Sequence, residues 1–189
     1  MKSIMISIKP KWCAKIMNGE KTIEVRKNKA LANAIQKLID ENGYADIYVY
    51  CSKDGYNHLH ELYDHSTDET LGYSTPYYKT NDVRKWRTEP EPLNGKVVFK
   101  FRCYKIDDYV NGRKWSWKVG APMWGACNDY EYILKDACLN DDELRDYSKD
   151  VASLYCIHIS HLEIFDRPKE LSEFNLTKAP QNFCYVGVE

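Results

Sequence analysis

The sequence has no Cys-x-x-Cys pair, no long apolar run and almost no net charge. Its seven cysteines are an odd number and stand far apart, so it predicts neither a disulfide framework nor a structural zinc site. No stretch approaches the roughly 20 apolar residues that a membrane helix needs. Residues 1–10 alternate apolar side chains without a signal-peptide core. We therefore expect a strand there, and a cytoplasmic protein with no membrane contact.

The charge is unevenly distributed. A net charge of −1 argues against a protein that wraps nucleic acid over much of its surface. Residues 1–37, however, carry nine basic against two acidic residues. This end of the chain predicts either a local anion-binding surface or a solvated helix face balanced by acids elsewhere.

Periodicity and turn signals predict alternating strands and helices. Helices are expected from Pro10 to a stop at Gly19, across 31–39 before Asn42-Gly43, and after capping-box patterns at Asn128 and Asn140. Three cysteines in apolar strand-like runs are expected to be small buried hydrophobes, namely Cys51, Cys103 and Cys156. The expected strands cover 4–8, 22–26, 46–51, 96–106, 152–165 (broken before Pro168) and 183–188.

The order of these elements predicts the fold class and the domain organisation. Mixed strands with few crossovers favour a single α+β domain over 1–189, as a small, nearly closed barrel with helices at its rim. Residues 53–93 exceed the usual length of a structureless loop, so we expect an insertion, lid or flap, with helical turns at His58–Asp64. This insertion is also a candidate surface for a protein partner.

The most informative stretch runs from Gly19 to Arg26. In a strand, Thr22, Glu24 and Arg26 share one face, while Ile23 and Val25 share the other and belong to the core. With Lys21 at the mouth of the strand, the carboxylate can accept from an exocyclic amine and the cations can pair with phosphate or a carbonyl oxygen. The alternative is a row of surface ion pairs on an exposed strand.

Three separated pieces of the chain resemble the ASCH family, whose fold is similar to PUA domains of RNA-modifying proteins. They are Ser7-Ile8-Lys9-Pro10, Gly19-x-Lys21-Thr22-x-Glu24-x-Arg26, and Ala179 to Val186. The resemblance implies a PUA-like mixed β-barrel that recognises RNA or a modified nucleoside in a cleft lined by Lys9, Lys21, Glu24 and Arg26.

The resemblance also implies a possible hydrolase. Some family members hydrolyse the acyl amide of N-acetylated cytidine with a lysine, a threonine and a glutamate. Here Lys21 matches the lysine, and Glu24 stands at the position of the threonine. If the chain is an enzyme, Lys21 and Glu24 would activate a water, and the reaction would be amidohydrolysis of an N-acylated cytidine or cleavage of RNA.

Several other residues are candidates for ligand contacts. Tyr50, Gln181 and Tyr185 could stack on or hydrogen-bond a base, although a buried tyrosine with a satisfied hydroxyl is commoner. His58 and His60 would face opposite ways on a helix, so we expect no metal site, and we expect no cofactor. The Trp115-Ser116-Trp117 stretch predicts either a stacking platform or a satellite core cluster.

Overall fold

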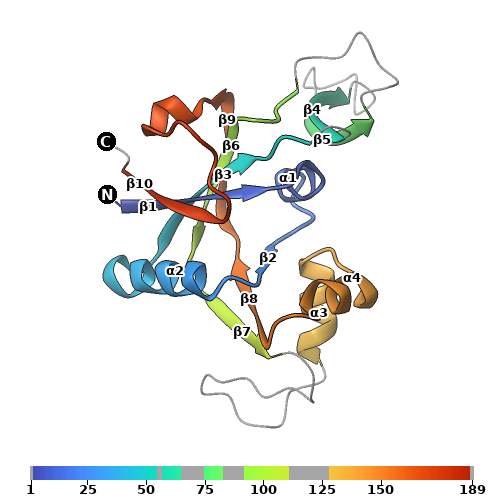
Figure 1. The fold of residues 1–189 in the computed structure, drawn as a ribbon. Helices are drawn as coiled ribbons and strands as arrows, with labels where there is room; N and C mark the ends of the chain where they lie inside the picture. The colour runs from blue at the N-terminus through green and yellow to red at the C-terminus, as the bar shows by residue number, and fades with distance from the viewer. Residues whose placement is uncertain (1, 55–56, 65–74, 83–91, 111–127, 188–189) are drawn as a thin grey trace.

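The computed structural model describes residues 2–54, 57–64, 75–82, 92–110 and 128–187, which form an α+β structure (Figure 1). The strands are β1 (Lys2–Ile8), β2 (Ile23–Arg26), β3 (Ala45–Cys51), β4 (Asn57–Asp64), β5 (Thr75–Asp82), β6 (Val97–Cys103), β7 (Ile106–Val110), β8 (Ser153–His158), β9 (Ser160–Lys169) and β10 (Phe183–Gly187). The helices are α1 (Pro10–Met17), α2 (Lys29–Asn42), α3 (Asn128–Asp136), α4 (Asp141–Ser148) and a 3-10 helix at Leu171–Phe174. Of the helices described here, none is both long and apolar enough to cross a membrane.

The largest sheet has five strands in the order β10-β1-β3-β6-β9. β1 and β3 run parallel, and the other neighbours are antiparallel. Because side chains alternate along a strand, Ile4 and Ile6 pack on one face of this sheet and Met5 packs on the other. The first face is covered by α1 and α2, and the second by the 3-10 helix through Phe174. Burial on both faces explains the nearly continuous apolar run of β1.

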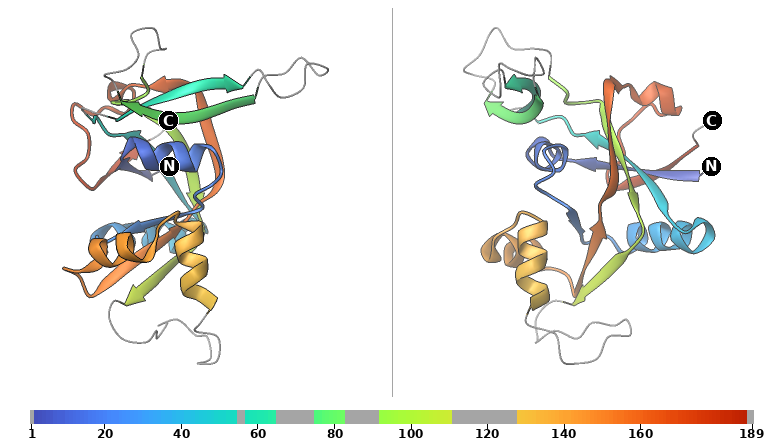
Figure 2. Two further views of the ribbon diagram at one scale, coloured as in Figure 1. Left: turned by 90° about the vertical axis from the view of Figure 1, so that its right-hand side faces the viewer. Right: turned by 180° about the vertical axis from the view of Figure 1, so that it is seen from behind.

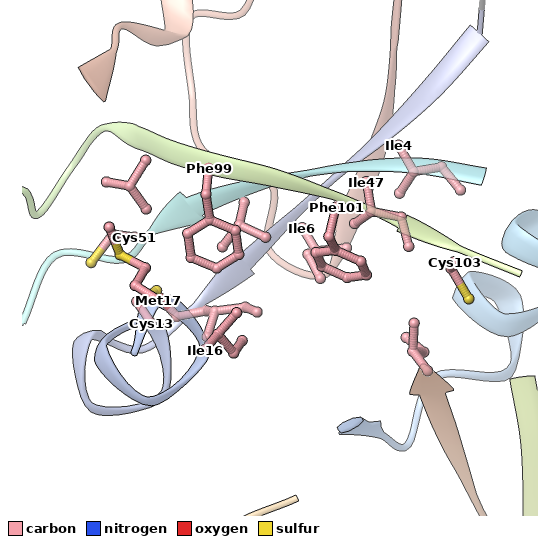
Figure 3. Close-up of a cluster of buried hydrophobic side chains, with 14 of the residues drawn as sticks. Ile4, Ile6, Cys13, Ile16, Met17, Ile47, Cys51, Phe99, Phe101 and Cys103 are labelled. Atoms are coloured by element: carbon pink, nitrogen blue, oxygen red, sulfur yellow. The ribbon is translucent and has the colours of Figure 1, made fainter. Parts of the chain in front are cut away.

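The main core lies between the five-stranded sheet and the helices α1 and α2. Phe99 and Phe101 of β6 are fully buried at its centre, and Ile16 of α1 packs in the same cluster (Figure 3). Complete burial of one such side chain contributes roughly 1.5–3 kcal/mol relative to exposure. Cys51 and Cys103 are also fully buried here, which confirms their predicted role as small hydrophobes.

A second sheet has three strands in the order β2-β8-β7. Only short links separate β6 from β7 and β8 from β9, so the same two chain segments run through both sheets (Figure 1). A backbone hydrogen bond of 3.2 Å from His158 N to Lys105 O lies at these links. The described strands pair as separate sheets, and the expected nearly closed barrel is not confirmed by their hydrogen bonding.

The expected helical turns at His58–Asp64 are wrong, because β4 pairs with β5 as an antiparallel hairpin. The amide of Asn18, after α1, pairs with the Tyr78 backbone through bonds of 2.8 and 2.9 Å. Leu59 and Tyr78 are buried in the main core. Figure 2 shows α1 lying between this hairpin and the α3–α4 pair.

Most of the other predicted elements are confirmed. α1 ends at Met17, two residues before Gly19, which has a φ of +74°, and α2 ends at Asn42, before Gly43, which is also in the left-handed region. Asn140 and Glu143 form the predicted capping box of α4, while the side chain of Asn128 lies outside the described residues. The expected break before Pro168 is wrong. β9 is an edge strand, and proline is tolerated there because one side of the strand needs no ladder hydrogen bonds.

Candidate functional site

Strand β2 brings a charged cluster, Lys21, Glu24 and Arg26, into the interior of the protein. Only 3% of Lys21 and 6% of Glu24 is exposed, and 17% of the Arg26 side chain. This strand therefore does not form the row of exposed ion pairs that was considered as the alternative. Charged side chains are rarely buried so fully unless they are paired.

The Glu24 carboxylate lies between the two cations. Its Oε2 is 3.4 Å from Lys21 Nζ, and its Oε1 is 2.9 Å from Arg26 Nε. Lys21 Nζ also donates to the Ala137 carbonyl at 2.8 Å, and Arg26 Nη2 donates to the Ser7 carbonyl at 2.7 Å. The buried Nε of Arg26 has no acceptor in hydrogen-bonding geometry, so its contact with Glu24 is one of charge. Two positive charges against one leave the cluster with a surplus positive charge.

Local structure explains how these side chains reach the interior. Gly19 reverses the chain after α1, and the N–H groups of Glu20 and Lys21 both donate to the Lys15 carbonyl. The apolar residues of β2, Ile23 and Val25, pack with α3 and α4, as the alternation predicted. Glu24 and Arg26 consequently point to the opposite face of the three-stranded sheet.

Two aromatic rings border the charged cluster. Trp12 of α1 is partly buried, and its ring lies 5.1 Å from Lys21 Nζ. Tyr147 of α4 is 38% exposed. Partial burial raises the pKa of Tyr147, with the Arg26 cation opposing that shift and the Glu24 carboxylate adding to it. Both rings therefore lie within electrostatic reach of the cluster.

Cys13 connects the cluster to the main core. This thiol is fully buried, and burial raises its pKa well above the usual value, with contributions from Cys51 and Glu24. The two cysteines lie at the same end of the core cluster (Figure 3). A thiol held neutral is a poor nucleophile, so Cys13 serves as packing.

The remaining predicted contact residues lie apart from the cluster or at its margin. Lys9 is exposed at the N-cap of α1. Tyr50 is buried on the opposite face of the five-stranded sheet from α1, with Met5 and Phe174. Gln181 is exposed and follows Pro180, whose carbonyl accepts a hydrogen bond from the Ser7 hydroxyl at 2.6 Å.

Tyr185 lies near the other end of β1. It is 41% exposed, and Lys2 Nζ lies 4.0 Å from the centre of its ring. The structure therefore brings together Lys21, Glu24 and Arg26. It does not bring Tyr50 or Tyr185 to them.

A second polar group joins β7 and β8. His158 Nε2 lies 2.7 Å from Asp107 Oδ2, and Lys105 Nζ lies 2.9 Å from the same oxygen. Burial acts to raise the pKa of Asp107, but the hydrogen bonds from His158 and Lys105 outweigh it and leave that pKa below its usual value. This arrangement stabilises a carboxylate between two strands.

No grouping of three or more His, Cys, Asp or Glu side chains suited to a metal ion occurs within the described ranges. His58 and His60 share one face of β4, with ring centres 6.2 Å apart, because the segment is a strand and not a helix. The Trp115-Ser116-Trp117 stretch, and residues 65–74 and 83–91 of the insertion, lie outside the described residues.

Sequence reasoning missed Trp12, Tyr147 and the Ala137 carbonyl. Trp12 packs against the main core, and its ring also faces Lys21. The capping box at Asn140 and Glu143 located α4, and Tyr147 is four residues after Glu143 on the same helix face. This four-residue spacing was the sequence signal that could have placed Tyr147 beside Glu143 on α4.

The chain has an α+β fold of the kind found in ASCH domains. A structure of the ASCH protein from Zymomonas mobilis aligns with a TM-score of 0.52 and 14% identity, covering 98% of this chain and 87% of that one. A mutant of the Zymomonas protein aligns with a TM-score of 0.55 and 14% identity, covering 99% of this chain and 91% of that one. The ASCH resemblance is thus confirmed at the level of the fold.

Sequence comparisons add little to this. No family model matches the chain. The ATP synthase subunit alpha of Ureaplasma parvum is 25% identical over 130 residues, which cover 69% of this chain. The aligned part is 14% of that protein's length, and this level of identity does not place the chain in its family.

Proposed function

We propose that this chain binds RNA or a modified nucleoside at the charged cluster. The observation that carries the proposal is the burial of Lys21 and Glu24 in direct contact, beside a partly exposed Arg26. Isolated surface ion pairs contribute little to stability, and a buried pair is often no better than an apolar one. An internal cluster with surplus positive charge, held in an ASCH-type fold, suits recognition of a polar planar ligand that carries negative charge.

Each member of the cluster would have a distinct role. Arg26, the most exposed of the three, would make a charge-assisted contact with phosphate or a base carbonyl. Glu24 would release Arg26 and accept a hydrogen bond from the exocyclic amine of a base, as carboxylates do from cytosine N4. Lys21 would remain against the Ala137 carbonyl and balance the carboxylate. The two sheets would act as walls of a PUA-like barrel around this site, with Lys9 and Gln181 at its margin.

Hydrolysis at the same cluster is the second candidate function. The contact of 3.4 Å between Lys21 and Glu24, away from bulk water, favours it because a desolvated site strengthens charge interactions with a reacting group. Glu24 would take a proton from a water that attacks an acyl or phosphoryl centre, and the leaving group would receive that proton. The substrates would be an N-acylated cytidine or RNA.

Titration of short labelled single-stranded RNA and of N-acylated cytidines tests both functions. Arg26→Ala should weaken binding of every RNA sequence to a similar extent. Arg102→Ala is the matched control, because Arg102 also pairs with a carboxylate, Asp46, at 3.2 Å. Thermal melts of each variant would verify that it folds.

Mass spectrometry of the same mixtures separates binding from turnover. Product formed by the wild type and absent with Lys21→Ala would establish a hydrolase. Binding without product would establish a binding module. A wild type that neither binds nor converts any of these ligands would overturn the proposal.

A further inference from the structure

Trp12 and Tyr147 come from different helices and border the same charged cluster. Trp12 lies on α1 beside Lys21, and Tyr147 lies on α4 within electrostatic reach of Arg26 and Glu24. The Tyr147 ring also contacts the ammonium group of Lys27, one residue after β2. Each ring is therefore held near the cluster by contacts with β2 or its flanking residues.

Lysine ammonium groups cover both rings. Lys11 Nζ lies 4.4 Å and Lys21 Nζ lies 5.1 Å from the centre of the Trp12 ring. Lys27 Nζ lies 4.6 Å from the centre of the Tyr147 ring. Lys21 is buried and held by Glu24 and the Ala137 carbonyl, whereas cation–ring contacts at partly exposed sites are weak, so an incoming base can displace Lys11 or Lys27 at small cost.

An exposed ion pair joins the two helices. Lys11 Nζ lies 3.3 Å from Glu143 Oε1, and these side chains are 54% and 39% exposed. Glu143 and Tyr147 are four residues apart and lie on the same face of α4. Because an exposed pair of this kind contributes little to stability, this connection between α1 and α4 is easily broken.

We propose that Trp12 and Tyr147 are the base-stacking residues of this site, and that its ligand is a nucleotide of a single-stranded RNA and not a free nucleoside. Stacking on a ring would displace Lys11 or Lys27, and the displaced lysines would pair with the flanking phosphates. This inference rests on the proposed function and specifies its ligand.

The direct test compares labelled single-stranded RNA with an abasic strand of equal length, which keeps the phosphates and lacks the bases. Tyr147→Leu and Trp12→Leu should each weaken RNA binding roughly tenfold, since stacking contributes about 1–3 kcal/mol per base. Binding of the abasic strand should not change. Tyr147→Phe and Trp12→Phe keep a ring and should stay within about threefold of the wild type.

Tyr104→Leu is the matched control. Tyr104 is 42% exposed, close to the 38% of Tyr147, and its ring packs against Tyr44 and His161. Its substitution should leave RNA binding unchanged. Lys27→Ala should weaken the RNA and the abasic strand equally, because it removes a phosphate contact.

The outcomes distinguish this inference from the function on which it rests. If the wild type binds RNA and both leucine variants bind it equally well, the stacking role is overturned and the binding function stands. If the leucine variants lose RNA and abasic strand to the same extent, the rings act through the fold and the stacking role is again overturned. A wild type that binds neither strand overturns both proposals.

Discussion

At the scale of single residues, Glu24 carries the charge balance of the cluster. Removing an ion from water costs several kcal/mol even after the protein relaxes. Glu24 offsets that cost for Lys21 and Arg26 at once, because each of its oxygens faces a different cation. Loss of this one carboxylate would leave both Lys21 and Arg26 without this counter-ion.

Substitution of Glu24 by glutamine keeps the shape of the side chain and removes its charge. We expect the free energy of unfolding to fall by about 3–5 kcal/mol, because Lys21 stays buried without its counter-ion. Urea denaturation would measure this loss. Glu41→Gln breaks the exposed Lys37–Glu41 pair and should cost less than about 1 kcal/mol. Equal losses in the two variants would contradict the assigned role of Glu24.

The Asp107 carboxylate predicts a dependence of stability on pH. Its pKa is held below the usual value, so its stabilisation is present above the unfolded-state pKa of about 3.9 and is lost as pH falls through the folded-state pKa. Asp107→Asn should therefore destabilise the protein at pH 7, with the difference shrinking below about pH 4. Denaturant titrations at several pH values would reveal this.

Asp146→Asn is the control for that series, since Asp146 is 78% exposed and forms a surface ion pair with Lys149. Its difference from the wild type should stay small at every pH. A difference between Asp107→Asn and the wild type that grows on acidification would refute the assignment.

At the scale of elements, sequence reasoning succeeded where local signals decide the conformation. Pro10 and Gly19 mark the two ends of α1, and alternation in β2 separates Ile23 from Glu24. It failed for β4, because the polar run His58–Asp64 becomes a strand only through pairing with β5, whose residues stand apart in the chain. The alternation of β2 also could not predict that Glu24 is buried, because its burial depends on other parts of the chain. The Ala137 carbonyl and the Trp12 ring, which contact its partner Lys21, both come from outside β2.

The docking of the β4–β5 hairpin on α1 can be tested through Asn18. Asn18→Ala removes the two hydrogen bonds between the Asn18 amide and the Tyr78 backbone, which should cost about 1–3 kcal/mol. Hydrogen exchange at the Tyr78 amide should accelerate accordingly. Asn42→Ala removes a single bond to the Leu38 carbonyl at the end of α2 and should leave that exchange unchanged. Unaltered exchange in Asn18→Ala would show that the Asn18 bonds do not hold the hairpin against α1.

At the scale of the whole molecule, the near-neutral net charge limits how many phosphates the protein can contact. Each phosphate contact on a single strand contributes about −0.7 to the slope of log affinity against log salt concentration. If Arg26, Lys11 and Lys27 make these contacts, the slope for RNA should be about −2. Fluorescence anisotropy over a series of salt concentrations would measure it.

Removing one contact should change that slope by a defined amount. Lys27→Ala should reduce its magnitude by about 0.7, whereas Lys37→Ala, which affects a residue paired with Glu41 on α2, should not. Binding that is insensitive to salt would exclude phosphate recognition by the basic residues of 1–37.

The pairing of β1 with β10 joins residues 2–6 to residues 183–187. During synthesis on the ribosome, β1 can pair with β3 early. Its other neighbour, β10, is made only after nearly the whole described chain has been translated. The Ser7 hydroxyl bond to Pro180 is delayed in the same way, and Ser7 is the residue whose carbonyl accepts from Arg26. At typical elongation rates of about 5–20 residues per second, roughly ten seconds or more pass between the synthesis of β1 and that of β10. The nascent chain therefore carries an open sheet edge for that interval, the stage at which a chaperone would have most effect on its yield.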